Sequence, residues 1–187
     1  MKVVIPVAGA GLHLRPHTHT QPKPLVPVAG KPILGHIVET FIATGVRDFI
    51  FVIGYLGDRI EEFIRTTYGT KIKAEFVIQE PREGSAHAIW TARKFIEKEK
   101  EIIITLGDTI INMNYQKLLD SKFSVVGVSK VSNPRHFGIA ETNEDFFINK
   151  LIEKPLIPKS NLALIGVYKI LNIPLLLDSI EHVIKAK

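Results

Sequence analysis

The sequence predicts an α/β fold, a three-layer sandwich in which helices cover both faces of a mostly parallel mixed sheet. Two observations predict it. Short apolar runs alternate with segments of helical periodicity through residues 1–112, which is typical of parallel strands joined by right-handed crossovers. Residues 113–187 depart from that alternation and contain a hairpin pattern. We therefore expect a single domain, 1–187, made of a first part at about 1–112 and a second part at about 113–187.

The first part supplies the parallel strands. Apolar runs bounded by turn residues predict strands at Val3–Val7, Asp48–Ile53, Lys73–Gln79 and Glu101–Leu106. Helical spacing of apolar residues predicts helices at 33–42, from 58 onward, and at Gly84–Lys98. In the second part a short helix follows Asn114. The sequence then predicts strands at Phe123–Val131 and Leu162–Ile170, a hairpin formed by Phe137–Glu141 and Phe146–Ile152, and a closing helix at Pro174–Ala186.

Composition is ordinary for a globular protein, with 45% hydrophobic and 23% charged residues and no cysteine. No apolar run approaches the roughly 20 residues that cross a bilayer, and the N-terminus lacks a signal-peptide pattern. We expect a cytoplasmic protein that does not bind a membrane. The net charge of +5 suits anionic ligands, but the basic residues are scattered or interleaved with glutamates. Nucleic acid is therefore not an expected partner.

The loop after the first strand, Gly9–Lys31, is the most informative stretch. Gly9 and Gly11 allow the backbone to approach a ligand, and successive N–H groups in such a loop can bind phosphate oxygens. Lys23 stands between Pro22 and Pro24, which stiffen its backbone. An ordinary strand-to-helix turn is the alternative, because G-x-G alone is a weak signal. The lysine between prolines favours an anion site.

Two further polar residues follow predicted strands. Gln79 ends the third strand, and its amide can pair with the imide edge of uracil or thymine; a solvent-facing glutamine is the alternative. Asp108 follows the fourth strand and can hold Mg²⁺, or it can be an ordinary turn residue. Because the carboxyl ends of parallel strands meet at one edge, these residues are expected near the glycine loop.

These motifs resemble those of the sugar-1-phosphate nucleotidylyltransferases, especially the glucose-1-phosphate thymidylyltransferases. The opening signature of that family is matched by Ala8, Gly9, Gly11, Leu14, Pro16, Thr18, Pro22, Lys23, Lys31 and Pro32. The runs L-G-D-T-I (106–110), F-G-I (137–139), L-I-E-K-P (151–155) and K-S-N-L-A-L-I-G-V-Y (159–168) also follow it. Leu12 and His13 depart from the pattern, since the family has Thr-Arg there, and that arginine contacts nucleotide phosphates.

The resemblance implies a Rossmann-like fold of the nucleotide-diphospho-sugar transferase type. It also implies a reaction that joins a sugar 1-phosphate, with glucose 1-phosphate as the first expectation, to dTTP or UTP and releases pyrophosphate. Catalysis is expected from Lys23, His13 and Arg15, with Mg²⁺ on Asp108. Nucleotide binding is expected from Ala8, Gly9, Ala10, Gly11, Gln79, Gly84 and Ser85. Sugar-phosphate binding is expected from Gly138, Glu153, Lys154, Asn161 and Leu164. For Glu153 and Lys154 the alternative is a surface charge pair.

Two other functions stay open. Leu12 and His13 favour a non-catalytic nucleotide-sugar binding domain, and a mannose-1-phosphate guanylyltransferase would share the fold. In the family a second metal-binding aspartate follows the G-V-Y strand, whereas the last one here, Asp178, fits a solvent-facing helix position. We therefore expect a fragment or a shortened relative that binds nucleotide better than it turns it over, and whose unpaired sheet edge favours a homo-oligomer.

The histidines are expected to have no metal role. His13, His17 and His19 cluster in the first loop. A zinc site, however, needs three or four ligands in fixed geometry, and nothing else nearby supplies the remaining ligands. His87 and His136 are interpreted as helix and loop residues with no assigned role.

Overall fold

A computed structural model describes residues 1–186 and confirms the α/β class. The chain forms two compact units: unit 1 consists of residues 1–125 and 169–186, and unit 2 is Val126–Tyr168. The functional division expected near residue 112 does not coincide with the boundary of these units, and it stays a prediction. No helix among residues 1–186 combines the length and the apolar character needed to cross a bilayer.

Unit 1 is built on four parallel strands in the order β5-β4-β1-β6. They are β1 (Lys2–Pro6), β4 (Asp48–Ile53), β5 (Lys73–Ile78) and β6 (Ile102–Thr105), close to the predicted ranges. Val4 on the central strand pairs with Ile50 on one side and Ile104 on the other. All three side chains are buried, as the continuous apolar runs predict for strands covered on both faces.

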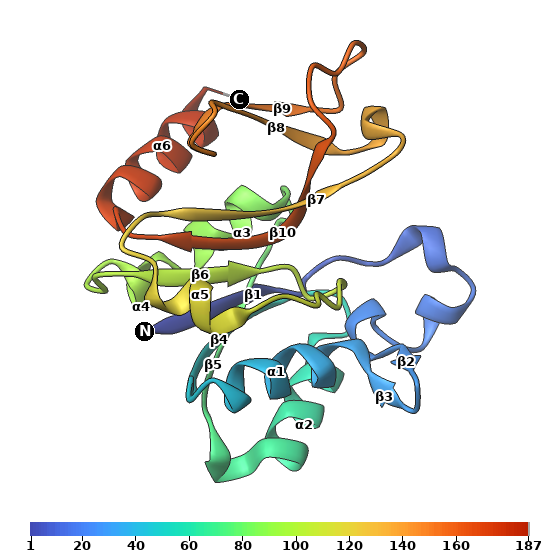
Figure 1. The fold of residues 1–187 in the computed structure, drawn as a ribbon. Coiled ribbons are helices and arrows are strands. Elements are labelled where there is room, and N and C mark those ends of the chain that lie inside the picture. Colours follow the sequence, from blue (N-terminus) through green and yellow to red (C-terminus); the bar gives the residue numbers. More distant parts are fainter. Residues whose placement is uncertain (187) are drawn as a thin grey trace. The chain divides into compact units, whose positions relative to one another are not determined.

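Helices cover both faces of this sheet. The connections of β1 to β4 and of β4 to β5 contain α1 (Ile33–Ala43) and α2 (Gly57–Tyr68), which lie together in Figure 1. The chain then crosses back from β5 to β6 through α3 (Ser85–Thr91), which contacts β1, β4 and the C-terminal helix α6 (Ile173–Lys185). Since crossovers are right-handed and this one runs in the opposite direction, α3 lies on the face opposite α1 and α2.

One local expectation is corrected, and two local features were not predicted. The predicted helix Gly84–Lys98 is divided at Ala92 into α3 and the short α4 (Arg93–Ile96). The loop after β1 contains 3-10 turns at Leu12–Leu14, His17–His19 and Lys23–Leu25. A small antiparallel ribbon, β2 (Pro27–Val28) with β3 (Lys31–Pro32), precedes α1 and was not expected.

Unit 2 supplies the antiparallel strands that make the fold mixed. Its hairpin consists of β8 (Gly138–Thr142) and β9 (Ile148–Glu153), and β10 (Leu162–Ile170) runs antiparallel to β8. The strand β7 (Val125–Lys130) pairs with β10. The predicted hairpin and the strand Leu162–Ile170 are therefore confirmed.

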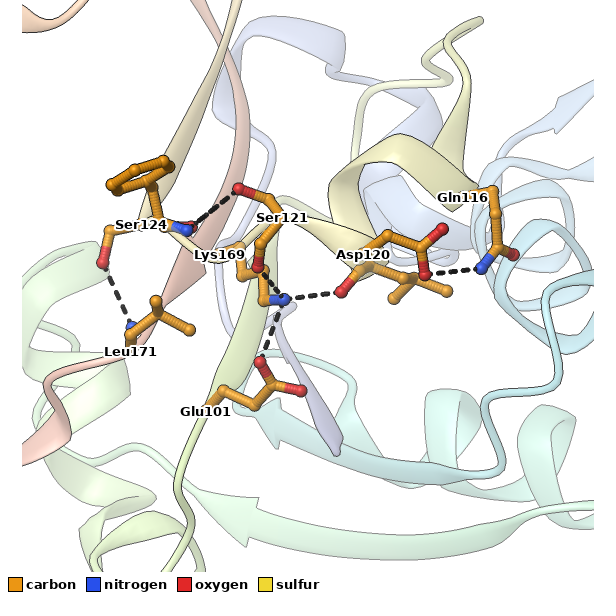
Figure 2. A network of polar contacts seen from close by, with 9 residues as sticks. Glu101, Gln116, Asp120, Ser121, Ser124, Lys169 and Leu171 are labelled. Carbon is orange, nitrogen blue, oxygen red and sulfur yellow. Dashed lines mark hydrogen bonds and ion pairs between the residues drawn. The ribbon is translucent and has the colours of Figure 1, made fainter.

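A buried lysine ties distant segments of unit 1 together (Figure 2). Lys169 Nζ donates to the carbonyl oxygens of Leu119 and Ser121 at 2.6 and 2.8 Å, and lies 2.9 Å from Glu101 Oε2. Leu119 belongs to α5 (Tyr115–Asp120), and Glu101 immediately precedes β6. The ammonium has three N–H donors and three acceptors, so its charge is buried with every donor used.

Candidate functional site

The carboxyl ends of the four parallel strands of unit 1 surround an open cavity of about 730 Å³. The lining comes from the loops after β1, β4, β5 and β6 and from the start of α3. Every residue that the sequence assigned to the nucleotide, to catalysis or to the metal lines this cavity: Ala8, Gly9, Ala10, Gly11, His13, Arg15, Lys23, Gln79, Gly84, Ser85 and Asp108. The structure thus brings the assigned residues of unit 1 together.

The glycine loop folds back on itself and fixes the base of Lys23. Gly11 has φ of +60°, and a Cβ there would lie 3.0 Å from both Lys23 Cβ and Thr18 Cγ2. The fully buried Thr18 donates from Oγ1 to the Gly11 carbonyl oxygen at 2.8 Å. A larger residue at position 11 would therefore strain the backbone and push Lys23 away from the cavity.

A second close approach places Asp108. A Cβ at Gly107 would lie 2.2 Å from Val7 Cγ1, so only glycine lets the chain after β6 pass this close to the end of β1. The next residue, Asp108, then faces the loop that carries Lys23. Lys23 Nζ lies 2.5 Å from Asp108 Oδ2, and both side chains remain about one-third exposed. Two groups from distant segments therefore form one ion pair at the cavity.

Asp108 supplies the cavity with a carboxylate that can bind a magnesium ion. Asp108 Oδ2 faces Lys23, and its Oδ1 accepts from Thr109 Oγ1 at 3.2 Å. Among residues 1–186 no group of three or more histidine, cysteine, aspartate or glutamate side chains is arranged to hold a metal. His13, His17 and His19 therefore do not form such a group. Mg²⁺ accepts one carboxylate when phosphates and water complete its shell, so Asp108 fits as its protein ligand.

Gln79 lies at the end of β5 with only 4% of its surface exposed. Its Nε2 donates to the Gly84 carbonyl oxygen at 2.9 Å and lies 3.2 Å from His87 Nδ1. The side chain is therefore held between the loop that precedes α3 and the first turns of that helix. The solvent-facing alternative for Gln79 does not describe this buried position.

Two cavity residues were missed by sequence reasoning. The two are Tyr55, which follows β4, and Arg82. The guanidinium carbon of Arg82 lies 5.9 Å from the centre of the Tyr55 ring. The Tyr55 hydroxyl donates to the His19 carbonyl oxygen at 3.1 Å, which links the end of β4 to the glycine loop. Tyr55 follows a predicted strand, the same signal that identified Gln79 and Asp108. With Arg15 and Lys23, Arg82 gives the cavity three cations against one carboxylate.

Unit 2 gathers a separate group of predicted residues. A Cβ at Gly138 would lie 3.0 Å from Glu153 Oε2 and 2.9 Å from Leu164 Cδ1. Burial raises the pKa of Tyr168, and the nearby Glu153 carboxylate raises it further. Lys154 lies 3.8 Å from Glu153, and it has φ of 40° with its N–H donating to the Phe137 carbonyl oxygen. Both charged side chains are exposed, so the surface charge pair expected as the alternative does form.

Asn161 is the predicted sugar-phosphate residue that lies apart from this group. It immediately precedes β10, whose first residue, Leu162, pairs with Ala140 of β8. Asn161 lines another hollow of unit 2, together with Lys130, Glu141 and Lys159. Its carbonyl oxygen accepts from the Val131 N–H at 3.0 Å.

Comparisons with known proteins identify the family of this chain. The family model described as "Nucleotidyl transferase" matches residues 2–185. The bifunctional protein GlmU of Methanococcus maripaludis is 36% identical over 174 residues, which cover 92% of this chain and 40% of that protein. A glucose-1-phosphate thymidylyltransferase of Streptomyces griseus is 34% identical over 173 residues, covering 90% of this chain and 48% of its own.

Solved structures show the same fold. The crystal structure of HddC from Yersinia pseudotuberculosis, complexed with GMP-PN, superposes with a TM-score of 0.76 at 26% identity and covers 95% of this chain and 79% of that one. The Rossmann-like class expected from the sequence is thereby confirmed. The chain spans less than half the length of the two curated relatives named above.

Proposed function

Because this chain belongs to the nucleotidyl transferase family, we propose that it transfers a nucleotidyl group from dTTP or UTP to a sugar 1-phosphate and releases pyrophosphate. Glucose 1-phosphate is the first acceptor to test, because the Streptomyces griseus relative is named for it. One observation carries the proposal: the glycine loop, Lys23, Asp108 and the buried Gln79 line one cavity of unit 1.

The chemistry needs charge neutralisation rather than a covalent intermediate. An oxygen of the sugar phosphate attacks the α-phosphorus of the nucleotide, and the bond from that phosphorus to pyrophosphate breaks in line. Lys23, Arg15 and Arg82 line the cavity and supply positive charge to the triphosphate. Backbone N–H groups of the glycine loop supply further donors to its oxygens.

The ion pair of Lys23 and Asp108 is expected to open when triphosphate binds. Phosphate oxygens are acceptors for the Lys23 ammonium, and they compete with the Asp108 carboxylate at 2.5 Å. Once released, Asp108 is available as the protein ligand of Mg²⁺. The ion, when bound, neutralises phosphate charge and assists departure of pyrophosphate.

In unit 2 the proposed binding residues for the sugar phosphate are Gly138, Glu153, Lys154 and Leu164. The Glu153 carboxylate accepts hydrogen bonds from sugar hydroxyls, and the Lys154 ammonium pairs with phosphate. Exposed side chains of opposite charge are suited to this, because each can exchange its partner for a ligand at little cost. Asn161, which lines another hollow of unit 2, is proposed with them only from the resemblance.

A second base specificity has a specific observation behind it. HddC, a structural relative, is complexed with GMP-PN, which is a guanine nucleotide. A guanylyltransferase, for instance with mannose 1-phosphate, is therefore the second candidate. The non-catalytic alternative rests on Leu12 and His13, which replace a threonine and an arginine at the rim of the same cavity.

Pyrophosphate release tests these proposals directly. The full chain is incubated with Mg²⁺ and each pairing of dTTP, UTP, GTP and CTP with glucose 1-phosphate and mannose 1-phosphate. Release with dTTP or UTP and glucose 1-phosphate is the expected result, and Asp108→Asn should abolish it. Binding of nucleotide without any release would support the binding domain instead, and preference for GTP would support the guanylyltransferase. A cytoplasmic location and a homo-oligomer remain predictions from the sequence.

A further inference from the structure

The orientation of the Gln79 amide is determined by its surroundings. The Gly84 carbonyl oxygen can only accept a hydrogen bond, and it lies 2.9 Å from one end of the amide. That end must therefore be the NH₂ group, and the opposite assignment would place two oxygens in contact. One of the two Nε2 hydrogens is thus used inside the protein.

The second hydrogen of Nε2 is used by a histidine. His87 Nδ1 lies 3.2 Å from Gln79 Nε2, in the first turns of α3. Since Nε2 is a donor, Nδ1 must be unprotonated and accept, so the proton of the neutral ring is on its own Nε2. Gly84 and His87 together use both N–H donors of Gln79.

Only the carbonyl oxygen of Gln79 is then left for a ligand. Within residues 1–186 no protein group donates to Gln79 Oε1, and no buried side-chain oxygen lacks a partner. Oε1 therefore reaches solvent, although only 4% of the surface of Gln79 is exposed. Because Gln79 lines the cavity of unit 1, a base that meets it there meets an acceptor and no donor.

We infer that His87 is a positioning residue for base selection: by accepting from Gln79 Nε2 it leaves Gln79 only an acceptor, which restricts the site to bases with a ring N–H. Uracil and thymine carry such an N–H at N3, and guanine carries one at N1, on the Watson–Crick edge that a base presents to a protein pocket. Cytosine and adenine present an unprotonated ring nitrogen there, which would face Oε1 with its lone pair. This inference rests on the proposed function, because it requires a nucleotide in the cavity.

The contact itself can be tested without nucleotide. Long-range ¹H–¹⁵N correlation of the histidine rings at about pH 8, where imidazole is neutral, should show the Nε2–H form for His87. The Nδ1–H form would overturn the inference, because such a ring cannot accept from Gln79.

Base selection is tested by calorimetric binding of UTP and CTP, which share the same triphosphate. The parent should prefer UTP. His87→Leu frees one Nε2 hydrogen for the cytosine ring nitrogen, so the UTP-to-CTP preference should fall by about tenfold, the effect of one hydrogen bond. His87→Asn should restore it, since Oδ1 of asparagine can accept where Nδ1 did. His36→Leu is the matched control, because His36 contacts the Val28 carbonyl oxygen and does not line the cavity.

The outcomes separate the two proposals. A parental preference in His87→Leu, in a variant that binds UTP and melts like the parent, would overturn the role of His87 and leave the proposed function standing. A parent that binds neither UTP nor CTP would overturn both. A reduced preference in His87→Leu with recovery in His87→Asn would support the inference, since a merely structural role for the ring would not give base-dependent rescue.

Discussion

Two lysines of unit 1 each pair with a carboxylate from a distant segment, yet their surroundings differ. Lys169 is buried, with only 2% of its side chain exposed, and it uses Glu101 and two carbonyl oxygens (Figure 2). Lys23 is 35% exposed and lines the cavity, and among residues 1–186 its one charged partner is Asp108. An ammonium has three donors, so Lys169 has none left for a ligand, whereas Lys23 keeps two.

The difference indicates how to tell a lysine that holds the fold from one that handles a ligand. A buried charge must have all its partners supplied by the protein, because each missing one leaves a desolvated group. An ion pair that is about one-third exposed contributes little to stability, and its lysine can exchange the carboxylate for phosphate. Removing Lys169 should therefore affect folding, and removing Lys23 should affect binding.

The largest expected effect is on Lys169. Lys169→Met keeps the length of the side chain but leaves the Glu101 carboxylate and two carbonyl oxygens without their donor. Breaking a buried pair costs several kcal/mol, and Glu101 is partly exposed, so the free energy of unfolding should fall by about 3 kcal/mol. Urea unfolding measures this. Lys185→Met is the control, because its exposed pair with Glu181 should change stability by less than about 0.5 kcal/mol. An equally small change in the free energy of unfolding for Lys169→Met would contradict the structural role assigned to Lys169.

Lys23→Ala tests the other half of the comparison. Losing a charge-assisted contact to phosphate costs roughly 1.5–3 kcal/mol, so nucleotide affinity or turnover should fall about 10- to 100-fold while the melting temperature stays near that of the parent. Lys31→Ala is the matched control: Lys31 pairs with Glu39 in the following segment but does not line the cavity. Unchanged binding and kinetics in Lys23→Ala would remove Lys23 from the site.

A third effect concerns Tyr68, a buried polar group that resembles Lys169 in being satisfied within the fold. Its hydroxyl donates to the Gly35 carbonyl oxygen at 3.3 Å, and burial, followed by the Glu39 carboxylate, raises its pKa from 10.0 to about 12. The folded state therefore binds more protons than the unfolded state between about pH 10 and 12. The stability contributed by neutral Tyr68 is full below pH 10 and is lost as pH rises through 12, and the total loss is about 3 kcal/mol. Tyr68→Phe should flatten this alkaline decline in urea unfolding, and an equally steep decline in that variant would contradict the assignment.

The comparison also shows what a sequence can reveal. Lys23, Gln79 and Asp108 were identified because each follows a predicted strand, and parallel strands bring their carboxyl ends to one edge. Lys169 was not, although the strand that contains it was placed correctly. Its carbonyl partners lie 48 and 50 residues away, and no local pattern distinguishes a lysine with buried partners from one in solvent.

The contact of Gln79 with His87 was missed for a similar reason. His87 was interpreted as an ordinary helix residue, since the periodicity of 84–98 says which residues face the core but not where the helix begins relative to β5. The division at Ala92 is also invisible in the sequence, because Ile89, Ala92 and Ile96 continue the helical spacing and no glycine or proline interrupts it. Ala92 and Ile96 are both fully buried, so this segment is one where tertiary packing can override local helix propensity.

The smallest expected effect is a gain in triphosphate affinity when Leu12 and His13, at the rim of the cavity, are replaced. Leu12 is 59% exposed at the rim of the cavity, and the neighbouring His13 lines it without the planar fork that a guanidinium presents to phosphate. Leu12→Thr with His13→Arg should therefore tighten triphosphate binding about five- to tenfold, roughly 1 kcal/mol, measured by calorimetry. His17→Arg adds the same charge to the same loop outside the cavity lining and should give little gain. If the double replacement gives no gain in affinity either, the affinity of Arg15→Ala in the parent distinguishes two explanations. A large loss of affinity there would show that Arg15 already supplies the fork, and no loss would show that this rim does not contact the phosphates.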